Sequence, residues 1–542
     1  MKYKFLITLL IITIKTSFAQ TTNIQWQKCL GGTKDDWAYS IKQTTDGGYI
    51  VAGGALSYDG DVTGNHQGSL SSPCMNSDDA WVVKLNNAGN IEWKKSLGGT
   101  CGEIAYSIQQ TLDGGYIIAA ITLSGDGDVS GSNNHGRFDY WIVKLNSVGT
   151  IQWQKCFGGT LEDFPYSIQQ TTDGGYIIAG QTASNDGDVS GNHGGDHDMW
   201  VIKLNSTGAL QWQKCLGGSG DDVAYSTQQT SDGGYIIAGY TASVNGDVSG
   251  SHNTSNGTYP ADAWIVKLTS NGNIQWQKCI GGSDDDRARF IQQTNDGGYI
   301  IAGQTSSSDG DLSAITTTGG YWIIKINSAG AIEWQKNLGG NDLGGSIATF
   351  IQQTNNGYIV AGETSSFNGD VTGNHGGRDF WIVKLNNSGT LQWQKCLGGS
   401  GFEDSGDAMF LQPMQRQEIH QTTDGGYIVA GATQSHDGDV TGNHSNVGFY
   451  DYWVIKLSPE LLTDVDEKQN TITISIYPNP SQTQLFLSEK LKTIEVYDFN
   501  GKLLMIEKES GMLNVKNLST GTYMLKGITM QGDNIETKFI KQ

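Results

Sequence analysis

Long apolar segments are almost absent from this chain. Only residues 5–14 form one, and a run of that length is too short to span a bilayer as a helix. Lys2 and Lys4 precede it and Ser17-Phe18-Ala19 follows it, a pattern typical of a secretory signal peptide. The sequence therefore predicts that residues 1–19 are removed on export and that the chain has no transmembrane segment.

Positive charge is also in short supply. The 542 residues hold 34 Lys and Arg against 55 Asp and Glu, which gives a formal net charge of −21. Such a surface repels nucleic acid and anionic membranes and attracts cations, so we expect no nucleic-acid partner. Solubility in an extracellular medium would by itself explain the acidity.

Helical periodicity is missing, and a repeat of short strand-like segments takes its place. Tryptophan marks the repeat in two series, one in the setting [Ile/Leu]-x-Trp-x-Lys and one heading Trp-[Val/Ile]-[Val/Ile]-Lys. The first series is Trp26, Trp93, Trp153, Trp212, Trp276, Trp334 and Trp393, and the second is Trp81, Trp141, Trp200, Trp264, Trp322, Trp381 and Trp453. The period is 58 to 67 residues. Alternation along the strands favours packing between repeats over glycan stacking for these side chains.

Each repeat has the pattern of four antiparallel strands. In the first repeat these are residues 38–44, 49–53, 79–85 and 91–95, with the turns Asp46-Gly47-Gly48 and Asn87-Ala88-Gly89. Seven such meanders predict an all-β, seven-bladed β-propeller. The array opens with a lone fourth-type strand and ends with a lone third-type strand, so the N-terminal strand should complete the last blade and close the ring. A solenoid is the alternative, but it would need capping units.

Cysteine follows the repeat with two exceptions. Five of the seven cysteines share one equivalent position and are expected as buried thiols: Cys29, Cys156, Cys215, Cys279 and Cys396. Cys74 lies in an enlarged loop of the first blade, and Cys101 lies in the loop that leaves the fourth strand of that blade. Because both loops should open on one face, we predict a Cys74–Cys101 disulfide, which export permits. Two free thiols are the alternative.

The last 72 residues differ in composition, with no Trp and no Cys. Strand-like runs at 471–477, 484–488, 493–498, 502–507, 513–515, 521–527 and 536–540 predict a small β-sandwich. Four motifs stand in order: Tyr477-Pro478-Asn479-Pro480, Val496-Tyr497-Asp498-Phe499-Asn500-Gly501-Lys502, Leu518-Ser519-Thr520-Gly521-Thr522-Tyr523 and Lys538-Phe539-Ile540-Lys541.

Together these motifs resemble the C-terminal sorting domain of type IX secretion cargo, type A. The resemblance implies passage across the outer membrane of Bacteroidetes-type bacteria, with the type IX machinery as partner, and a protein that is then released or anchored at the cell surface. The upstream repeats resemble the Gly-Gly-rich repeats common in such cargo. The predicted parts are a signal peptide at 1–19, the propeller at 20–457, a linker at 458–470 and the sorting domain at 471–542.

Acidic residues gather in the loops that should open on one face of the ring. An Asp-Gly-Asp loop recurs, and in six of the seven repeats a further Asp stands two residues before the second Trp. Carboxylates on glycine-containing loops suit Ca²⁺, which takes six to eight oxygen ligands. The candidate ligands are Asp59, Asp61, Asp79, Asp126, Asp128, Asp139, Asp186, Asp188, Asp198, Asp437, Asp439 and Asp451. The alternative is that these carboxylates cap turns through backbone N–H groups.

Three other site chemistries find less support. Histidines recur in the same loops, but equivalent positions in different blades do not converge on one zinc ion, which favours a loop hydrogen bond. The Thr44-x-Asp46-x-Gly48 hairpin is similar to the Asp-box turn of sialidase propellers, yet a sialidase clamps its substrate with three arginines, and the five here stand at non-equivalent positions. Carboxylate pairs for glycoside hydrolysis repeat in every blade, and no unique set of residues is seen to break the repeat.

The sequence therefore favours a secreted or cell-surface propeller that binds a glycan or a protein without catalysis and is exported by type IX secretion. A carbohydrate-active enzyme with its site on the acidic face is the alternative. A purely structural surface protein is the second alternative.

Overall fold

The computed structural model describes residues 22–66, 78–253, 257, 259–312, 319–340, 345–404, 417–446, 448–460, 476–498, 502–530 and 534–542. The predicted signal peptide and residues 461–470 of the predicted linker lie outside these ranges. The chain divides after Glu460 into two compact units, which are described one by one.

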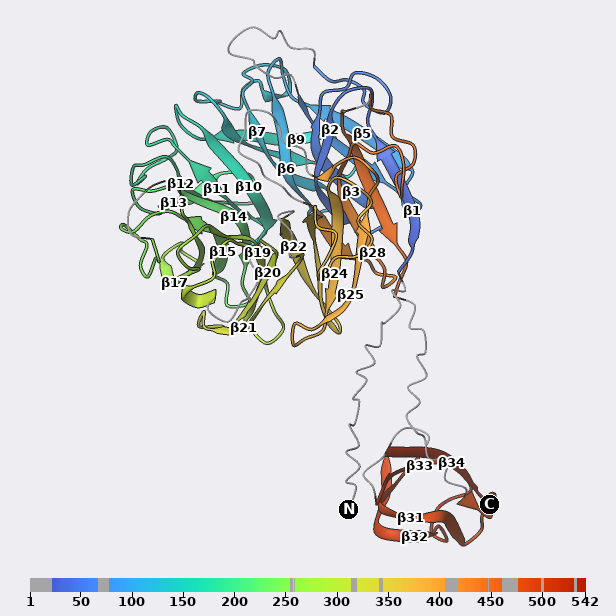
Figure 1. Ribbon diagram of the computed structural model, residues 1–542. Coiled ribbons are helices and arrows are strands. Elements are labelled where there is room, and N and C mark those ends of the chain that lie inside the picture. Colours follow the sequence, from blue (N-terminus) through green and yellow to red (C-terminus); the bar gives the residue numbers. More distant parts are fainter. Residues whose placement is uncertain are drawn as a thin grey trace, which may run out of the picture. The chain divides into compact units, whose positions relative to one another are not determined.

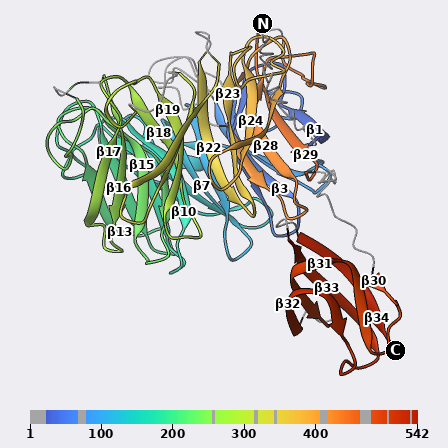
Figure 2. The ribbon, with the colours of Figure 1, turned by 60° about the horizontal axis from the view of Figure 1, so that its bottom comes forward.

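The first unit is the predicted seven-bladed propeller, in which seven antiparallel sheets stand around one axis (Figure 1, Figure 2). The first strands of the blades contact one another around the ring and therefore lie next to the axis. These are β2 (Asp36–Gln43), β6 (Glu103–Gln110), β10 (Asp163–Gln170), β14 (Asp222–Gln229), β18 (Asp286–Gln293), β22 (Ser346–Thr354) and, in two pieces, β26 (Glu403–Asp404) and β27 (Glu418–Gln421).

The remaining strands follow outward in chain order. The second strands are β3 (Tyr49–Ala55), β7 (Tyr116–Thr122), β11 (Tyr176–Thr182), β15 (Tyr235–Thr241), β19 (Tyr299–Thr305), β23 (Gly357–Thr364) and β28 (Tyr427–Thr433). The third strands are β4 (Asp79–Leu85), β8 (Asp139–Leu145), β12 (Asp198–Leu204), β16 (Asp262–Leu268), β20 (Tyr321–Ile326), β24 (Asp379–Leu385) and β29 (Asp451–Leu457). The fourth strands are β5 (Ile91–Leu97), β9 (Ile151–Phe157), β13 (Leu210–Leu216), β17 (Ile274–Ile280), β21 (Ile332–Leu338), β25 (Leu391–Leu397) and β1 (Ile24–Leu30). Two 3-10 turns, η1 (Gly127–Val129) and η2 (Gly310–Leu312), lie in the loops after second strands.

The ring closes as the sequence predicts. Strand β1 pairs antiparallel with β29, so that Leu30 lies opposite Tyr452 and Cys29 opposite Trp453 (Figure 2). The last blade thus combines the two ends of the propeller sequence. Because this pairing removes a free sheet edge, closure protects the ring from edge-to-edge association.

Both tryptophan series pack between blades. Trp141 is fully buried in a cluster that includes Ile50 and Val82 of the preceding blade. Trp93, from the other series, is half-buried and meets the ring of Tyr116 in the next blade edge to face at 5.6 Å. The hydrophobic core is therefore a set of layers between sheets, which explains why the second strands are apolar on both faces.

The hairpin between first and second strands is held by a buried lysine. In the second blade the Asp113 carboxylate accepts hydrogen bonds from Thr111 Oγ1 (2.5 Å) and Gly115 N (3.0 Å), and it lies 2.9 Å from Nζ of the buried Lys144. Gly114 has a φ of 80°, which favours glycine at that turn position. Partial burial opposes ionisation of Asp113, but the hydrogen bonds from Thr111 and Lys144 prevail and lower its pKa to about 2. The turn that resembles a sialidase Asp-box is thus structural.

The sixth blade tests this account. Its shorter turn has Asn356 in place of the aspartate, and the equivalent lysine, Lys384, donates to Thr354 Oγ1 at 2.7 Å instead. Without the carboxylate, burial lowers the pKa of Lys384 to about 8.

We expect Asp113→Asn to lower the free energy of unfolding at pH 7 by roughly 1–2 kcal/mol, because it leaves the buried Lys144 without its counter-charge. The loss is no larger because the Asp113 carboxylate is half exposed, so solvent already weakens its attraction to Lys144. The folded-state pKa of Asp113 lies below its unfolded value, so its contribution is present above pH 4 and is lost as the pH falls toward 2. Urea unfolding at both pH values measures this. Equal stability of the two proteins at pH 7 would contradict the role given to Asp113.

The second unit is one five-stranded antiparallel sheet around its own apolar cluster. Its strands are β30 (Ile476–Tyr477), β31 (Gln484–Tyr497), β32 (Leu503–Asn514), β33 (Gly521–Thr529) and β34 (Asn534–Lys541). The runs predicted separately at 484–488 and 493–498 form the single strand β31, whose register with β32 shifts between Phe486 and Leu491. Leu485 and Val496, from the two halves of β31, belong to the same buried cluster. The register shift thus lets one strand cover the two segments that the sequence predicted as separate strands.

Candidate functional site

The first aspartate of each Asp-Gly-Asp loop bonds to the loop that precedes the first strand of its blade. Asp126 Oδ1 accepts the backbone N–H of Thr100 at 2.8 Å, and its Oδ2 accepts the Thr100 hydroxyl at 2.9 Å. Asp59 and Asp186 make the same pair of bonds, and Asp437 accepts Ser400 N at 2.7 Å. Each of these carboxylates therefore joins two loops, through residues that lie 26 positions apart or, at Asp437, 37 positions apart.

The second aspartate of the loop lies at the boundary between two blades. Asp128 Oδ2 accepts Gly98 N at 3.3 Å. Asp188 Oδ2 lies 3.7 Å from Nε2 of His135 in the preceding blade, and Asp439 Oδ2 lies 3.9 Å from Nε2 of His375. Asp61 is half-buried at the equivalent position.

The third aspartate, which opens the third strand, is fully buried. Asp139 Oδ2 accepts His135 N at 2.7 Å and lies 3.1 Å from His135 Nδ1. Its Oδ1 is buried and has no hydrogen-bond partner among the described residues. The same orphaned oxygen occurs at Asp79, Asp198, Asp262, Asp379 and Asp451. The histidines thus have the loop-bonding role that the sequence favours, and each leaves one carboxylate oxygen unsatisfied.

A second buried carboxylate, from the first strand of the next blade, faces this aspartate. Asp163 accepts Gly159 N at 2.8 Å and Ser184 Oγ at 3.0 Å. A Cβ placed on Gly158 would stand 2.6 Å from both Asp139 Oδ1 and Asp163 Oδ2, so the two carboxylates converge on that glycine from adjacent blades. Burial raises the pKa of Asp139 to about 6 and that of Asp163 to about 7.

One of the seven interfaces lacks both carboxylates. Between the fifth and sixth blades Gly320 takes the place of the third-strand aspartate, and Ser346 takes the place of the first-strand acid. Ser346 Oγ is satisfied by Thr364 Oγ1 at 2.7 Å. The two acids are therefore present together or absent together, as expected of residues that act as one unit. Across the ranges that the structure describes, no group of three or more His, Cys, Asp or Glu side chains is arranged to hold a metal ion.

The repeat is broken at the axis, by residues other than carboxylate pairs. Among the described residues, six first strands carry a bulge, at Tyr39, Tyr106, Tyr166 and Tyr225 in the first four blades and at Arg289 and Thr349 in the next two. The four tyrosine rings contact one another from blade to blade, so the bulge position lies next to the axis. A bulge re-aims a side chain, and here it turns a buried guanidinium inward. The sequence signal was Ala288-Arg289-Phe290 in place of the usual Ala-Tyr-Ser pattern, but no local pattern of polarity marks the bulge itself.

The two arginines have different surroundings. Arg287 Nε donates to Asp285 at 2.9 Å, and its guanidinium lies over Tyr240 (4.3 Å) and the exposed Tyr259 (5.1 Å). Arg289 is 8% exposed and lies over Tyr225 at 4.7 Å, with one bond, from Nη2 to Gln304 at 3.3 Å. Within the described ranges, its Nε and Nη1 have no hydrogen-bond partner.

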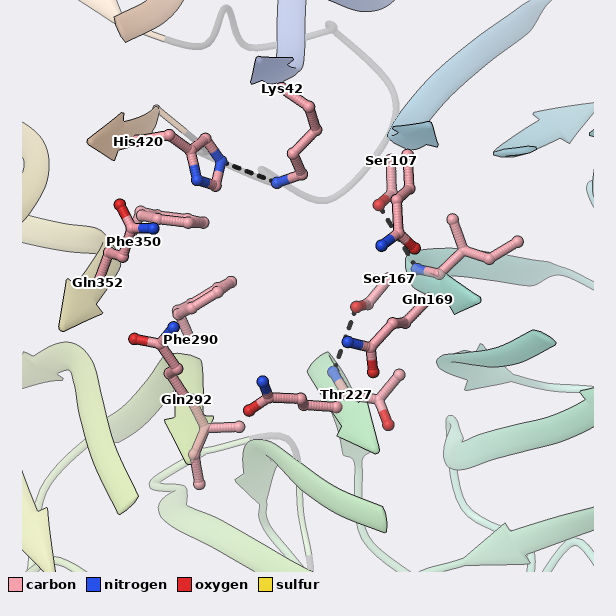
Figure 3. Close-up of a pocket in the computed structure, with 14 residues that line it drawn as sticks. Lys42, Ser107, Ser167, Gln169, Thr227, Phe290, Gln292, Phe350, Gln352 and His420 are labelled. Atoms are coloured by element: carbon pink, nitrogen blue, oxygen red, sulfur yellow. Dashed lines mark hydrogen bonds between the residues drawn. The ribbon is translucent and has the colours of Figure 1, made fainter. Parts of the chain in front are cut away.

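The other end of the bore, beside the tight hairpins, holds a cavity of about 130 Å³. Figure 3 shows Lys42, Ser107, Ser167, Gln169, Gln292, Phe290, Phe350 and His420 around one central opening. Lys42 Nζ lies 2.8 Å from His420 Nε2 and 3.0 Å from Glu418 Oε2. None of these residues was among the sequence-predicted site residues.

Cys101 is disulfide-bonded, and five other cysteines are free and buried. Cys74, its predicted partner, lies outside the described residues, so the pairing itself stays a prediction.

We expect non-reduced peptide mapping of the secreted protein to recover Cys74 and Cys101 in one cross-linked peptide, because their loops should open side by side on the exported protein. Alkylation of both thiols without reduction would rule the bridge out. The five buried cysteines are the internal control, since they should be alkylated only after unfolding.

The predicted sorting motif joins the two ends of the second unit. Tyr477 stacks on Phe486 at 5.9 Å, and Asn479 Oδ1 accepts Ile540 N at 2.8 Å. Pro478 and Pro480 follow cis peptide bonds. The motif thus anchors the last strand, β34.

Comparison with known proteins identifies this second unit. Residues 475–542 match the family model described as secretion system C-terminal sorting domain. The domain marks the chain as type IX cargo, which is exported to the cell surface or the medium and meets the type IX machinery on the way. In the described ranges, no helix has the length and apolar character needed to cross a membrane.

The propeller has more distant similarities. The regulatory protein FlaEY of Caulobacter vibrioides is 25% identical over 263 residues, which are 45% of this chain and 27% of that protein. The match thus spans about a quarter of the relative's own length. The Pan2 WD40 domain of Neurospora crassa (8% identity, TM-score 0.40, 79% of this chain and 95% of that chain) and Sqt1 of Chaetomium thermophilum (10%, 0.37, 86% and 97%) are similar solved structures. The fold assignment rests on the sheet topology described above.

Proposed function

We propose that this chain is a secreted or cell-surface adhesion protein whose propeller binds a glycan or protein ligand at the loop end of its axial bore, without catalysis. The observation that carries this proposal is the buried, incompletely bonded guanidinium of Arg289, at the place where the repeat breaks.

The energetics of Arg289 favour a ligand. A buried charge without a counter-charge is costly, and a carboxylate or hydroxyl oxygen of a bound molecule would satisfy Nε and Nη1. Tyr225 and Tyr240 are buried beneath the two guanidinium groups, whereas Tyr259, beside Arg287, is 60% exposed and offers an aromatic ring to a sugar or a side chain. Arg289 thus supports binding more directly than it supports the fold.

The experiment is a binding screen of the exported protein against polysaccharides and host proteins, followed by Arg289→Met. We expect this variant to melt at the same or a higher temperature, because it removes an uncompensated buried charge, and to bind the captured ligand at least about tenfold more weakly. Arg137→Met is the matched control, since Arg137 is exposed and pairs with Glu162 elsewhere on the surface. Equal loss of affinity in both variants would contradict the site.

The two alternatives predict different results in the same screen. An enzyme would release reducing sugar, and one Asp→Asn change would abolish the release. A purely structural surface protein would bind none of the polysaccharides or host proteins in the screen, with or without the Arg289→Met change.

We further propose that Ca²⁺ binds between blades at the six carboxylate pairs. The support is the orphaned Oδ1 of each third-strand aspartate, which faces a second carboxylate. Main-chain oxygens and water would complete the coordination, so the affinity should be in the weak range of extracellular calcium modules.

Millimolar Ca²⁺ should raise the melting temperature of chelator-treated protein, because an ion that binds only the folded state at about ten times its Kd adds roughly 1.4 kcal/mol per site. Calorimetry measures the rise. Asp139→Asn should reduce it, while Asp126→Asn, whose carboxylate is occupied by Thr100, should not. Identical melting curves with chelator and with Ca²⁺ would contradict Ca²⁺ binding and leave these aspartates with a structural role.

A further inference from the structure

We propose that the hairpin end of the bore binds a small oxyanion, the carboxylate, sulfate or phosphate group of a ligand, through a ring of side-chain N–H and O–H donors. This site is separate from the arginine site at the loop end and does not depend on it.

The glutamines of the ring have their amides oriented by the backbone of the neighbouring blade. Each Oε1 accepts an N–H from the next first strand at 2.6 to 2.8 Å: Gln109 from Gln170, Gln169 from Gln229, Gln228 from Gln293, Gln292 from Gln353 and Gln352 from Gln421. A backbone N–H can only donate, so it fixes which end of each amide is oxygen. The NH₂ groups are left for the bore, and Figure 3 shows those of Gln169, Gln292 and Gln352 turned toward the opening.

The serine hydroxyls are biased in the same way. Ser107 Oγ accepts Ile168 N at 3.4 Å, and Ser167 Oγ accepts Thr227 N at 3.2 Å. Each hydroxyl therefore retains its proton for donation, and both side chains line the cavity. The wall thus presents donors from several blades toward one space.

The charges of the wall agree with an anionic occupant. Lys42 and His420 take the places that glutamines hold in the other blades. None of the described residues that line the cavity is Asp or Glu, although the chain carries a net charge of −21. Glu418, which pairs with Lys42 at 3.0 Å, is fully buried behind the wall, where its Oε2 also accepts Ser40 Oγ (3.0 Å) and Ile41 N (2.9 Å). The side-chain N–H and O–H donors therefore carry the argument for an anion more than the net charge of the wall does.

The size of the space limits the ligand to one small group. A cavity of about 130 Å³ holds several water molecules or a single oxyanion, and it is too small for a whole sugar chain. Phe290 and Phe350, whose ring centroids are 4.0 Å apart, close one side of it. Donors without competing acceptors discriminate against cations and favour an oxyanion, as concave arrays of N–H groups do elsewhere.

The test is calorimetric titration of the full exported chain with sodium sulfate, sodium phosphate and sodium glucuronate, each against sodium chloride of equal ionic strength. Gln228→Glu keeps the acceptor for Gln293 N but replaces the inward NH₂ with a negative oxygen. Gln229→Glu is the matched control, because its Oε1 accepts Thr172 N at 2.8 Å and the residue lies outside the cavity. Melting curves of both variants without oxyanion establish that each is folded.

We expect Gln228→Glu to weaken oxyanion binding by at least about tenfold and Gln229→Glu to leave it unchanged. Binding of free sulfate or phosphate identifies a small ion as the source. Binding of glucuronate without them identifies a group carried on a glycan, and both outcomes support the site. No binding of any of the three ions, or equal loss in the two variants, would overturn it. Arg289→Met should leave the oxyanion titrations unchanged if the ion binds at the hairpin end of the bore. A loss of oxyanion binding can therefore be distinguished from a loss of ligand binding at the arginine site.

Discussion

The ring depends on hydrogen bonds that side chains of one blade make to the backbone of the next. The last two residues of most first strands are glutamines, and they bond in opposite directions around the axis. Gln169 accepts from Gln229 N of the following blade, whereas Gln170 accepts from Leu112 N in the hairpin of the preceding one. Blades of a propeller share no sheet hydrogen bonds, so their innermost backbone groups need partners of another kind. The same bonds that hold the blades together also orient the amides of the bore.

The glutamine hydrogen bonds stabilise the ring, whereas the buried carboxylates at the blade interfaces lower its stability. Two acids from adjacent blades meet at Gly158, and a histidine satisfies one of them only in part. A purely structural solution exists in the same molecule, because Ser346 and Thr364 replace this arrangement with one neutral hydrogen bond. Repetition of the costly version in the other interfaces is the reason we propose a cation there.

Residues that recur in every repeat build the propeller, and residues that occur once distinguish one blade from another. The lysine-anchored hairpins and the buried tryptophans recur with the repeat and serve packing. Arg287, Arg289, Lys42 and His420 do not recur, and all of them lie along the axis, where residues from every blade come within reach of one ligand. We therefore place both proposed binding sites on the axis, where the side chains of different blades differ.

The number of blades can be predicted from the sequence alone, and so can the closure of the ring by β1 and β29, the glycine turns and the C-terminal sorting domain. These follow from signals contained within a few residues of one strand or turn, repeated at a regular period. The three-dimensional structure was needed to tell the aspartates that join two loops from those that are buried, because Asp126 and Asp139 differ in the groups that neighbouring segments place against them. It also decided that a bulge turns Arg289 into the bore and that glutamine amides face the axis. These contacts join residues about sixty positions apart, on different blades, and no local pattern of polarity records them.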